Sequence, residues 1–166
     1  MTRALGLDLG ERRIGVAIVD GPGAGARPLV TLRRGRAIDD DVAALRALVD
    51  AHAIEELVVG LPIDAAGHEG AQAALTRDWV EDIRARMGED VTITFRDERL
   101  SSHVAERRLG PMKRGRSGGP PSRQQRDEYR ARVDREAAAV ILQDELDHRA
   151  AGGDAASTPS TRESRT

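Results

Sequence analysis

Acidic residues at three separated places in the chain have the types and settings for metal-assisted chemistry. Asp8 lies inside the apolar stretch 5–9, where an acid is unusual because a buried carboxylate must be paired, metal-bound or neutralised. Gly15 and Ala17, across an expected hairpin, are small and leave space beside Asp8 for an ion or a phosphate. An Asp-x-Gly sequence is also typical of an ordinary strand end, so this residue alone does not decide the function.

The other two acidic positions lie at the ends of predicted elements. Asp97 and Glu98 follow the strand-like residues 91–95, and open α/β sheets bind ligands beyond the carboxyl ends of their strands. Asp134 lies at the edge of the apolar face of a late helix, where the alanines 137–139 allow a close approach to a sheet. Solvated loop charges and an ion pair on a helix surface are the ordinary alternatives.

Carboxylates from a strand, a strand end and a late helix can converge on one place. Such a cluster is unfavourable without cations, and its hard oxygen atoms suit Mg²⁺ or Mn²⁺. Two such ions held ~3.5–4 Å apart activate water and stabilise the leaving oxygen in phosphodiester cleavage. This hypothesis gives Asp8 a reason to interrupt an apolar strand, namely metal binding.

Hydrophobic patterning predicts the elements that must position these acids. Apolar segments predict strands at residues 4–9, 14–19, 28–32, 56–62 and 91–95. Amphipathic segments predict helices that begin at the acids 39–41 and that cover residues 69–87, 102–109 and 127–149. The order β-β-β-α-β-α-β-α-α describes an α/β fold with one sheet, antiparallel at its start and then parallel through right-handed crossovers.

The chain of 166 residues is long enough for one compact domain, which we expect over residues 1–150. Residues 110–125 are rich in Gly, Pro and Arg and predict a flexible loop. Residues 151–166 are small and polar and predict a disordered C-terminal tail.

Composition limits the classes of function. The absence of cysteine excludes a disulfide framework and thiolate chemistry, and the absence of a signal peptide or a long apolar run predicts a cytoplasmic protein without a membrane partner. The net charge is −2, yet residues 99–135 carry 11 basic and 4 acidic side chains. This segment is either a surface that faces a polyanion or a solvated, arginine-rich loop.

Four motifs resemble a known family in their order and nearly in their spacing. They are "LGLDLGERRIGVAIVD", "VVGLPIDAAGHEG", "DERLSS" and "VDREAAAVILQDEL", and they cover about residues 3–149. The chain thereby resembles the YqgF family, bacterial RNase H-like proteins described as pre-16S rRNA nucleases and as similar to Holliday-junction resolvases. The resemblance implies an RNase H-like α/β fold, with a five-stranded mixed sheet, its first three strands antiparallel, flanked by helices.

The resemblance also implies a divalent-metal nuclease site, with Mg²⁺ or Mn²⁺ in a two-metal arrangement. By motif position the catalytic and metal-binding acids are Asp8, Glu98 and Asp134. The matching supporting positions are Gly10, Gly15, Gly60, Pro62, Gly67 and Asp97. The arginines expected to bind nucleic acid are Arg13, Arg99, Arg107 and Arg108.

The function implied is hydrolysis of phosphodiesters in structured RNA, with 5′-end processing of pre-16S rRNA in ribosome biogenesis as the expected role. Resolution of branched DNA is the main alternative, and it demands a homodimer, whereas RNA trimming allows a monomer. A binding protein for ribosomal precursors or transcription complexes, without catalysis, is a further alternative. Actin-like kinases share the strand Asp-x-Gly hairpin, but this chain has neither their length nor a second copy of that hairpin.

Overall fold

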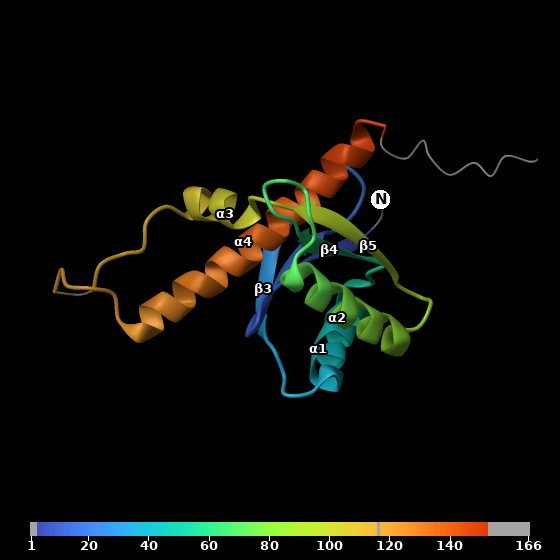
Figure 1. Ribbon diagram of the computed structural model, residues 1–166, viewed down its shortest axis with the longest axis horizontal. Helices are drawn as coiled ribbons and strands as arrows, with labels where there is room; N and C mark the ends of the chain where they lie inside the picture. Colours follow the sequence, from blue (N-terminus) through green and yellow to red (C-terminus); the bar gives the residue numbers. More distant parts are fainter. Residues whose placement is uncertain (1–2, 116, 153–166) are drawn as a thin grey trace, which may run out of the picture.

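The computed structural model describes residues 3–115 and 117–152, and a five-stranded sheet forms its centre (Figure 1). The strands are β1 (Ala4–Leu9), β2 (Arg13–Val19), β3 (Arg27–Arg33), β4 (Glu56–Pro62) and β5 (Thr92–Glu98). Their order in the sheet is β3-β2-β1-β4-β5. The first three strands pair antiparallel, and β4 and β5 continue the sheet parallel to β1. The predicted mixed five-stranded sheet is therefore confirmed.

Helices cover both faces of this sheet. They are α1 (Ile38–His52), α2 (Ala71–Met87), α3 (Ser101–Leu109) and α4 (Arg123–Ala150). The main hydrophobic core joins α1 and α2 to one face, and a second cluster joins α4 to the other face. Helix α3 packs on α4 through a third cluster that includes Ala105, Val133 and Ala137. Within the described residues, no helix is long and apolar enough to cross a membrane.

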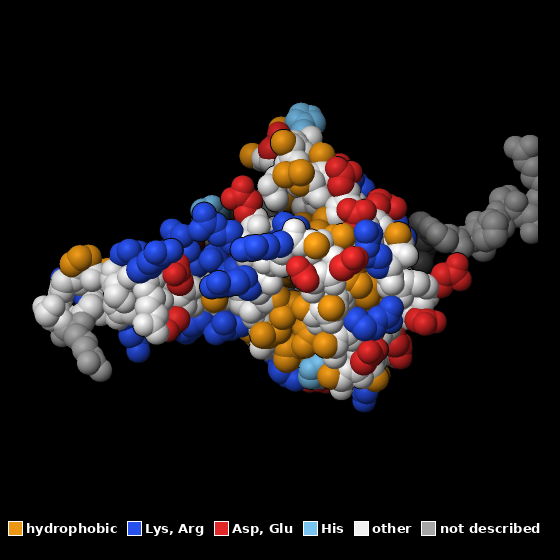
Figure 2. Space-filling model, turned by 90° about the horizontal axis from the view of Figure 1, so that it is seen from below, with side chains coloured by type: hydrophobic (Ala, Val, Ile, Leu, Met, Phe, Trp, Pro, Cys, Tyr) orange, Lys and Arg blue, Asp and Glu red, His pale blue; other side chains and the backbone are white. Residues whose placement is uncertain are grey.

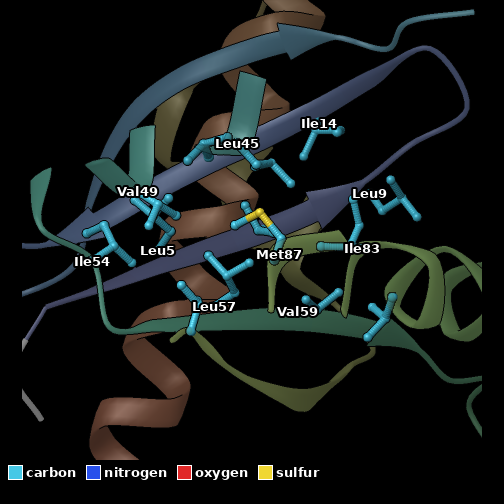
Figure 3. Packing of buried hydrophobic residues seen from close by; sticks show 14 of the residues in the cluster. Leu5, Leu9, Ile14, Leu45, Val49, Ile54, Leu57, Val59, Ile83 and Met87 are labelled. Atoms are coloured by element: carbon cyan, nitrogen blue, oxygen red, sulfur yellow. The ribbon is translucent and has the colours of Figure 1, made fainter. Parts of the chain in front are cut away.

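The side chains of β1 alternate between the two faces of the sheet, and each face is covered by different helices. Leu5, Leu7 and Leu9 point into the core beneath α1 and α2, where they meet residues such as Leu45 and Ile83 (Figure 3). The intervening positions 4, 6 and 8 face α4, and the alanine there belongs to the second cluster. The acid at position 8 is therefore on the α4 face, where its neighbours are small.

Glycines let α4 lie almost directly on the sheet. A Cβ atom at Gly6 would lie 2.6 Å from the carbonyl oxygen of Ala138, and one at Gly15 would lie 1.9 Å from the carbonyl oxygen of Asp134. Both distances are far below van der Waals contact, so these two positions exclude any larger residue without movement of the helix. The close approach that the alanines 137–139 predicted is present, with the complementary small residues on the strands.

Two element boundaries differ from the sequence predictions by three residues or more, and the others that differ do so by one or two. Strand β5 continues through Glu98 because residues 96–98 still pair with β4, so this acid is in the strand and not in the loop after it. Helix α4 begins at Arg123, four residues before the predicted start, because Ser122 and Gln125 form a capping box. The predicted loop 110–125 therefore ends at residue 122. Its residue 116, and residues 153–166 of the predicted tail, lie outside the described residues.

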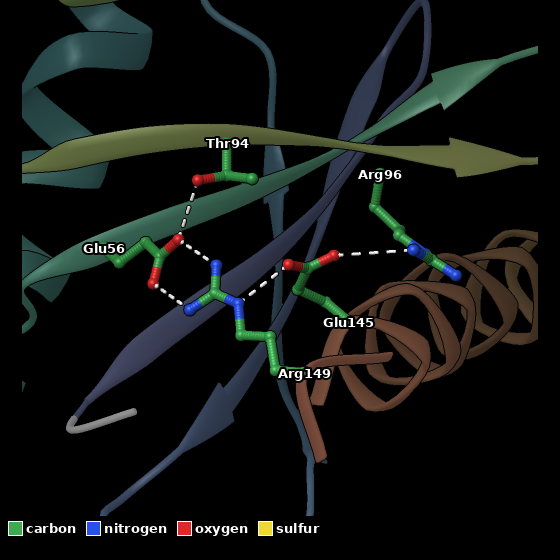
Figure 4. A network of polar contacts seen from close by, with 5 residues as sticks. All are labelled: Glu56, Thr94, Arg96, Glu145 and Arg149. Carbon is green, nitrogen blue, oxygen red and sulfur yellow. Dashed lines mark hydrogen bonds and ion pairs between the residues drawn. The ribbon is translucent and has the colours of Figure 1, made fainter. Parts of the chain in front are cut away.

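A polar network fixes the C-terminal half of α4 to β4 and β5 (Figure 4). Arg149 donates to both carboxylate oxygens of Glu56, at 2.9 and 2.6 Å, and through Nε to Glu145 at 2.8 Å. The second oxygen of Glu145 lies 3.7 Å from Arg96, and Thr94 donates to Glu56 at 2.7 Å. Burial would raise the pKa of Glu56, but the hydrogen bonds from Arg149 and Thr94 lower it below its ordinary value.

We expect Arg149→Gln to lower the free energy of unfolding by about 2 kcal/mol, because it leaves two partly buried carboxylates without their common partner. Urea unfolding measures this difference. Arg84→Gln is the matched control, since Arg84 and Glu81 form an exposed ion pair on α2. The control should change stability by less than about 0.5 kcal/mol.

The difference in the free energy of unfolding between wild type and Arg149→Gln has a defined pH dependence. The pKa of Glu56 is lower in the folded chain than its ordinary value of 4.5, so the stabilisation is complete above that value and is lost as the pH falls through the lowered pKa. The difference between wild type and Arg149→Gln should therefore shrink below about pH 4.5. A difference that stays constant down to about pH 3 would contradict this origin.

Candidate active site

Asp8 is the residue around which the site is built. It is the fifth residue of β1, and its Cα partner across the hairpin is Gly15. Its pKa is raised well above the ordinary 3.8 by burial first and then by the negative charges of Glu98 and Asp134. The structure therefore brings acids from β5 and α4 into the electrostatic neighbourhood of the acid on β1.

Glu98 reaches the site from the last position of β5. Its Cα pairs with Pro62, but its carboxylate turns back over Gly60, where a Cβ atom would lie 2.8 Å from Oε2. The hydroxyl of Ser101 donates a hydrogen bond to the other carboxylate oxygen. Burial raises the pKa of Glu98, and the Ser101 hydrogen bond offsets part of that rise. A desolvated carboxylate in a fixed orientation is the result.

Asp134 is brought to the site by the contact of α4 with β2. Its backbone lies against Gly15, and its side chain accepts a hydrogen bond from Nε of Arg13 at 2.5 Å. Glycines thus flank Asp8 on both neighbouring strands, Gly15 on β2 and Gly60 on β4. One makes room for the helix that carries Asp134, and the other makes room for the carboxylate of Glu98.

Two of the three carboxylates, those of Glu98 and Asp134, already have hydrogen-bond partners. The three carboxylates also stand apart from one another. Within residues 3–115 and 117–152, no three Asp, Glu or His side chains are grouped closely enough to hold one metal ion together. Arg13 binds one oxygen of Asp134, and Ser101 binds one oxygen of Glu98. A cation that uses Oδ2 of Asp134 would have to displace Arg13 from that oxygen.

The remaining residues predicted for the hairpin and the adjacent loop have structural contacts. The N–H of Gly10 donates to the carbonyl of Arg13 at 2.9 Å and closes the β1–β2 turn. Gly67 has a φ of +87°, which favours glycine, and a Cβ atom there would lie 3.3 Å from the guanidinium of Arg99. The loop is joined to the site because the N–H of Ile63 donates to the carbonyl of Glu98 at 3.1 Å.

A hollow of about 240 Å³ opens beside Glu98, between β5, α3 and α4. Its lining comprises Asp97, Glu98, Arg99, Leu100, Ser101, Val104, Val140, Ile141 and Asp144. Asp97 and Arg99, the chain neighbours of Glu98, are exposed at its rim. Ser101 was missed by sequence reasoning, although its place three residues after Glu98 and at a helix start was a usable signal. Asp144 gave no such signal.

Arg107 and Arg108 lie on α3, and Arg108 forms an ion pair with Glu136 on α4 at 3.2 Å. They are in the last turn of α3, about 9 Å along the helix from Ser101. They belong to a projection formed by residues 101–115 and 117–135, which we call the basic arm (Figure 1). Lys and Arg side chains gather over the arm, whereas Asp and Glu are more frequent over the body of the domain (Figure 2). Its exposed arginines include Arg107, Arg108, Arg126, Arg130 and Arg132.

The fold defines the class of protein to which the chain is similar. A solved structure of RuvC from T. thermophilus, in complex with a Holliday junction substrate, matches with a TM-score of 0.53 at 13% identity. The match covers 91% of this chain and 97% of that chain. At this identity the likeness concerns the fold alone, which is that of the RuvC-like resolvases.

The family follows from the sequence. Residues 2–148 match the family model RuvX, described as Holliday junction resolvase, and the chain belongs to this family. RuvX is the YqgF family that the motifs resemble, so that prediction is confirmed.

Relatives named "Putative pre-16S rRNA nuclease" include one from Anaeromyxobacter dehalogenans (strain 2CP-C), 43% identical over 89% of this chain and 98% of that protein. Another, from Acaryochloris marina (strain MBIC 11017), is 42% identical over 88% of this chain and 92% of that protein. The expectation of a nuclease, a hydrolase acting on phosphodiester bonds, is supported at the level of the family.

We expect Gly15→Ala to lower the free energy of unfolding by about 3 kcal/mol, because its Cβ would meet backbone atoms of α4 that cannot turn aside. Gly21→Ala is the matched control, since nothing lies within 4 Å of a Cβ atom there. Its effect should stay within about 0.5 kcal/mol in the same urea titration. Equal stability of the two variants would show that α4 does not rest on β2 as described.

Proposed function

We propose that this chain is a metal-dependent nuclease whose cation is held by Asp8, Glu98 and Asp134. The observation that carries the proposal is the setting of Asp8 on β1, a partly buried carboxylate whose pKa is raised by burial first and then by the charges of Glu98 and Asp134. Burying an acid among other acids is unfavourable unless a cation accompanies them. Selection for a site at this place explains why β1 carries an acid where the fold itself favours a small apolar residue.

The donor set fits a hard divalent cation. All three side chains offer carboxylate oxygens, which suit Mg²⁺ or Mn²⁺. When bound, such ions lower the pKa of water and stabilise the leaving oxygen of a phosphodiester. Ser101 holds the orientation of Glu98, and the glycines at 15 and 60 fix the distance of the other two acids from Asp8.

The basic surface supports a nucleic-acid substrate. Arg99 lies at the rim of the hollow beside Glu98, where a phosphate next to the cleaved bond would pass. Arg107 and Arg108 are exposed on the basic arm, and Arg108 pairs with Glu136 on α4. Phosphate contacts of this kind position a nucleic acid without reading its sequence. Arg99 would thus align the phosphodiester bond to be cleaved, and the basic arm would hold the sugar–phosphate backbone on either side of it.

The name shared by the relatives supports pre-16S rRNA as the substrate, with 5′-end processing in ribosome biogenesis as the role. The family description favours a second candidate, the four-way DNA junction. Resolution of a junction needs two sites acting together and hence a homodimer, whereas cleavage of RNA does not. Side-by-side assays on precursor rRNA, linear single strands and four-way junctions distinguish the two, and binding that persists in EDTA without any cleavage would indicate a binding protein.

We expect Asp8→Asn to reduce metal-dependent cleavage at least about a hundredfold while RNA binding in EDTA is retained. Mn²⁺ should raise the Tm of the wild type and not that of the variant. Without metal, the variant should be the more stable protein at neutral pH. The raised pKa of Asp8 means that the folded chain holds this proton more tightly than the unfolded chain, so ionisation destabilises the fold as the pH rises.

Calorimetry or thermal unfolding at neutral pH measures both stabilities. A wild type that gains no stability from Mn²⁺, or a variant that cleaves as well as the wild type, would contradict the proposal. Asp20→Asn is a suitable control, because Asp20 is an exposed residue that forms an ion pair with Arg27. It should leave cleavage unchanged.

We expect the double substitution Arg99→Gln with Arg107→Gln to weaken RNA binding, because fewer backbone phosphates are then neutralised. The slope of log K against log salt should become shallower by about 0.7–0.9 for each such phosphate. Fluorescence anisotropy at several salt concentrations gives the slope. Arg84→Gln is the control, since it removes the same type of charge from α2, which covers the other face of the sheet. An equal slope for the double variant and the wild type would exclude these two arginines from the interface.

A further inference from the structure

Arg13 makes a contact that its expected role does not explain. Its Nε binds Oδ2 of Asp134 at 2.5 Å, and the two side chains are only 28% and 25% exposed. A guanidinium that serves only nucleic acid would be free in solvent, whereas this one already has an acid of the site as its partner. The contact joins residues 121 positions apart, on β2 and α4.

The guanidinium is only partly used. Among the described residues, Arg13 donates through Nε, and no hydrogen bond from either of its terminal nitrogens is present. These two nitrogens form the fork that binds carboxylates and phosphates with two parallel hydrogen bonds. At 28% exposure, the side chain is accessible to an anion from solvent.

Both ends of the contact are anchored in the fold. The carbonyl of Arg13 accepts from Gly10, and its Cα pairs with Arg33 in β3. The backbone of Asp134 is held against Gly15. The guanidinium is thus the mobile part of the contact, and its rotation would release an oxygen of Asp134 without any movement of the sheet or of α4.

We propose that Arg13 is a positioning residue that occupies Asp134 in the metal-free protein and transfers to a substrate phosphate when a divalent cation takes Asp134. This inference rests on the proposed function. Arg13 holds Oδ2 of Asp134, so a cation that binds through this oxygen breaks the ion pair, and a phosphate restores a partner to the released guanidinium. Metal and nucleic acid must therefore bind cooperatively, and by linkage each strengthens the other by the same factor.

Calorimetric titration of the full chain with Mn²⁺, without nucleic acid, tests the competition. Arg13→Gln should bind Mn²⁺ about fivefold more tightly than the wild type, at the lower end of typical coupling factors. Arg84→Gln, which removes an arginine from the opposite layer, should bind Mn²⁺ as the wild type does. Affinity in Arg13→Gln that is equal to or weaker than that of the wild type would overturn the inference.

The cooperativity is measured on the wild type itself, so the test does not depend on the folding of a variant. Ca²⁺ serves as the probe cation because it is another hard ion that prefers oxygen ligands. Anisotropy of a labelled RNA hairpin should show about fivefold tighter binding in Ca²⁺ than in EDTA, with a gel to verify that the hairpin is intact. Arg13→Gln should show less than half of this factor, and an equal factor in both proteins would contradict a transfer of Arg13.

The two proposals fail in different ways. If Mn²⁺ binds the wild type but not Asp8→Asn, and Arg13→Gln does not tighten binding, the metal site stands and the role of Arg13 falls. If the wild type binds no Mn²⁺, or Asp8→Asn binds it equally well, the proposed metal site fails, and the inference about Arg13 fails with it.

Discussion

The direct contact of α4 with β1 and β2 is the constraint on which the rest of the structure depends. At Gly6 and Gly15 the strands present no side chain to the helix, and a Cβ atom at Gly15 would overlap the backbone of Asp134. This contact sets the height of α4 above Asp8, and with it the distance between the acid on the helix and the acid on the strand. Helix α3 packs on α4, so the basic arm takes its position from the same contact.

The two halves of α4 differ in the contacts that they make and in the side chains that they carry. The C-terminal half is held by Arg149, which joins Glu145 on the helix to Glu56 on β4. This network contributes stability and includes none of the three carboxylates of the site. The N-terminal half carries Arg126, Arg130 and Arg132 of the arm and is capped by Ser122. Both halves contribute to stability, because the Gly15 contact is made at Asp134 in the N-terminal half, whereas the Arg149 network lies in the C-terminal half.

Much of the fold was predictable because it follows from local patterns. The alternation in β1, the hairpin and the order of strands and helices are all visible in the sequence, and the three acids could be named from their motifs. The extension of β5 through Glu98 was not predictable, because it depends on pairing with β4 and not on local apolar character. The partner of Arg13 was also hidden, since a contact between side chains 121 positions apart leaves no periodic signal. The start of α4 could have been predicted, because the capping box is a short local motif.

The length of α4 has a mechanical consequence. A helix of 28 residues spans about 42 Å, so it extends well beyond the width of the sheet beneath it. The Arg149 network holds the C-terminal half of the helix, and Gly6 and Gly15 support its middle. The helix therefore resembles a lever that pivots at the Gly15 contact. A force on the N-terminal end of α4 would bend the helix about the Gly15 contact, and Asp134, which lies at that contact, would move least. Under the proposed function, this arrangement would keep Asp134 in place while the projecting end of the helix binds nucleic acid.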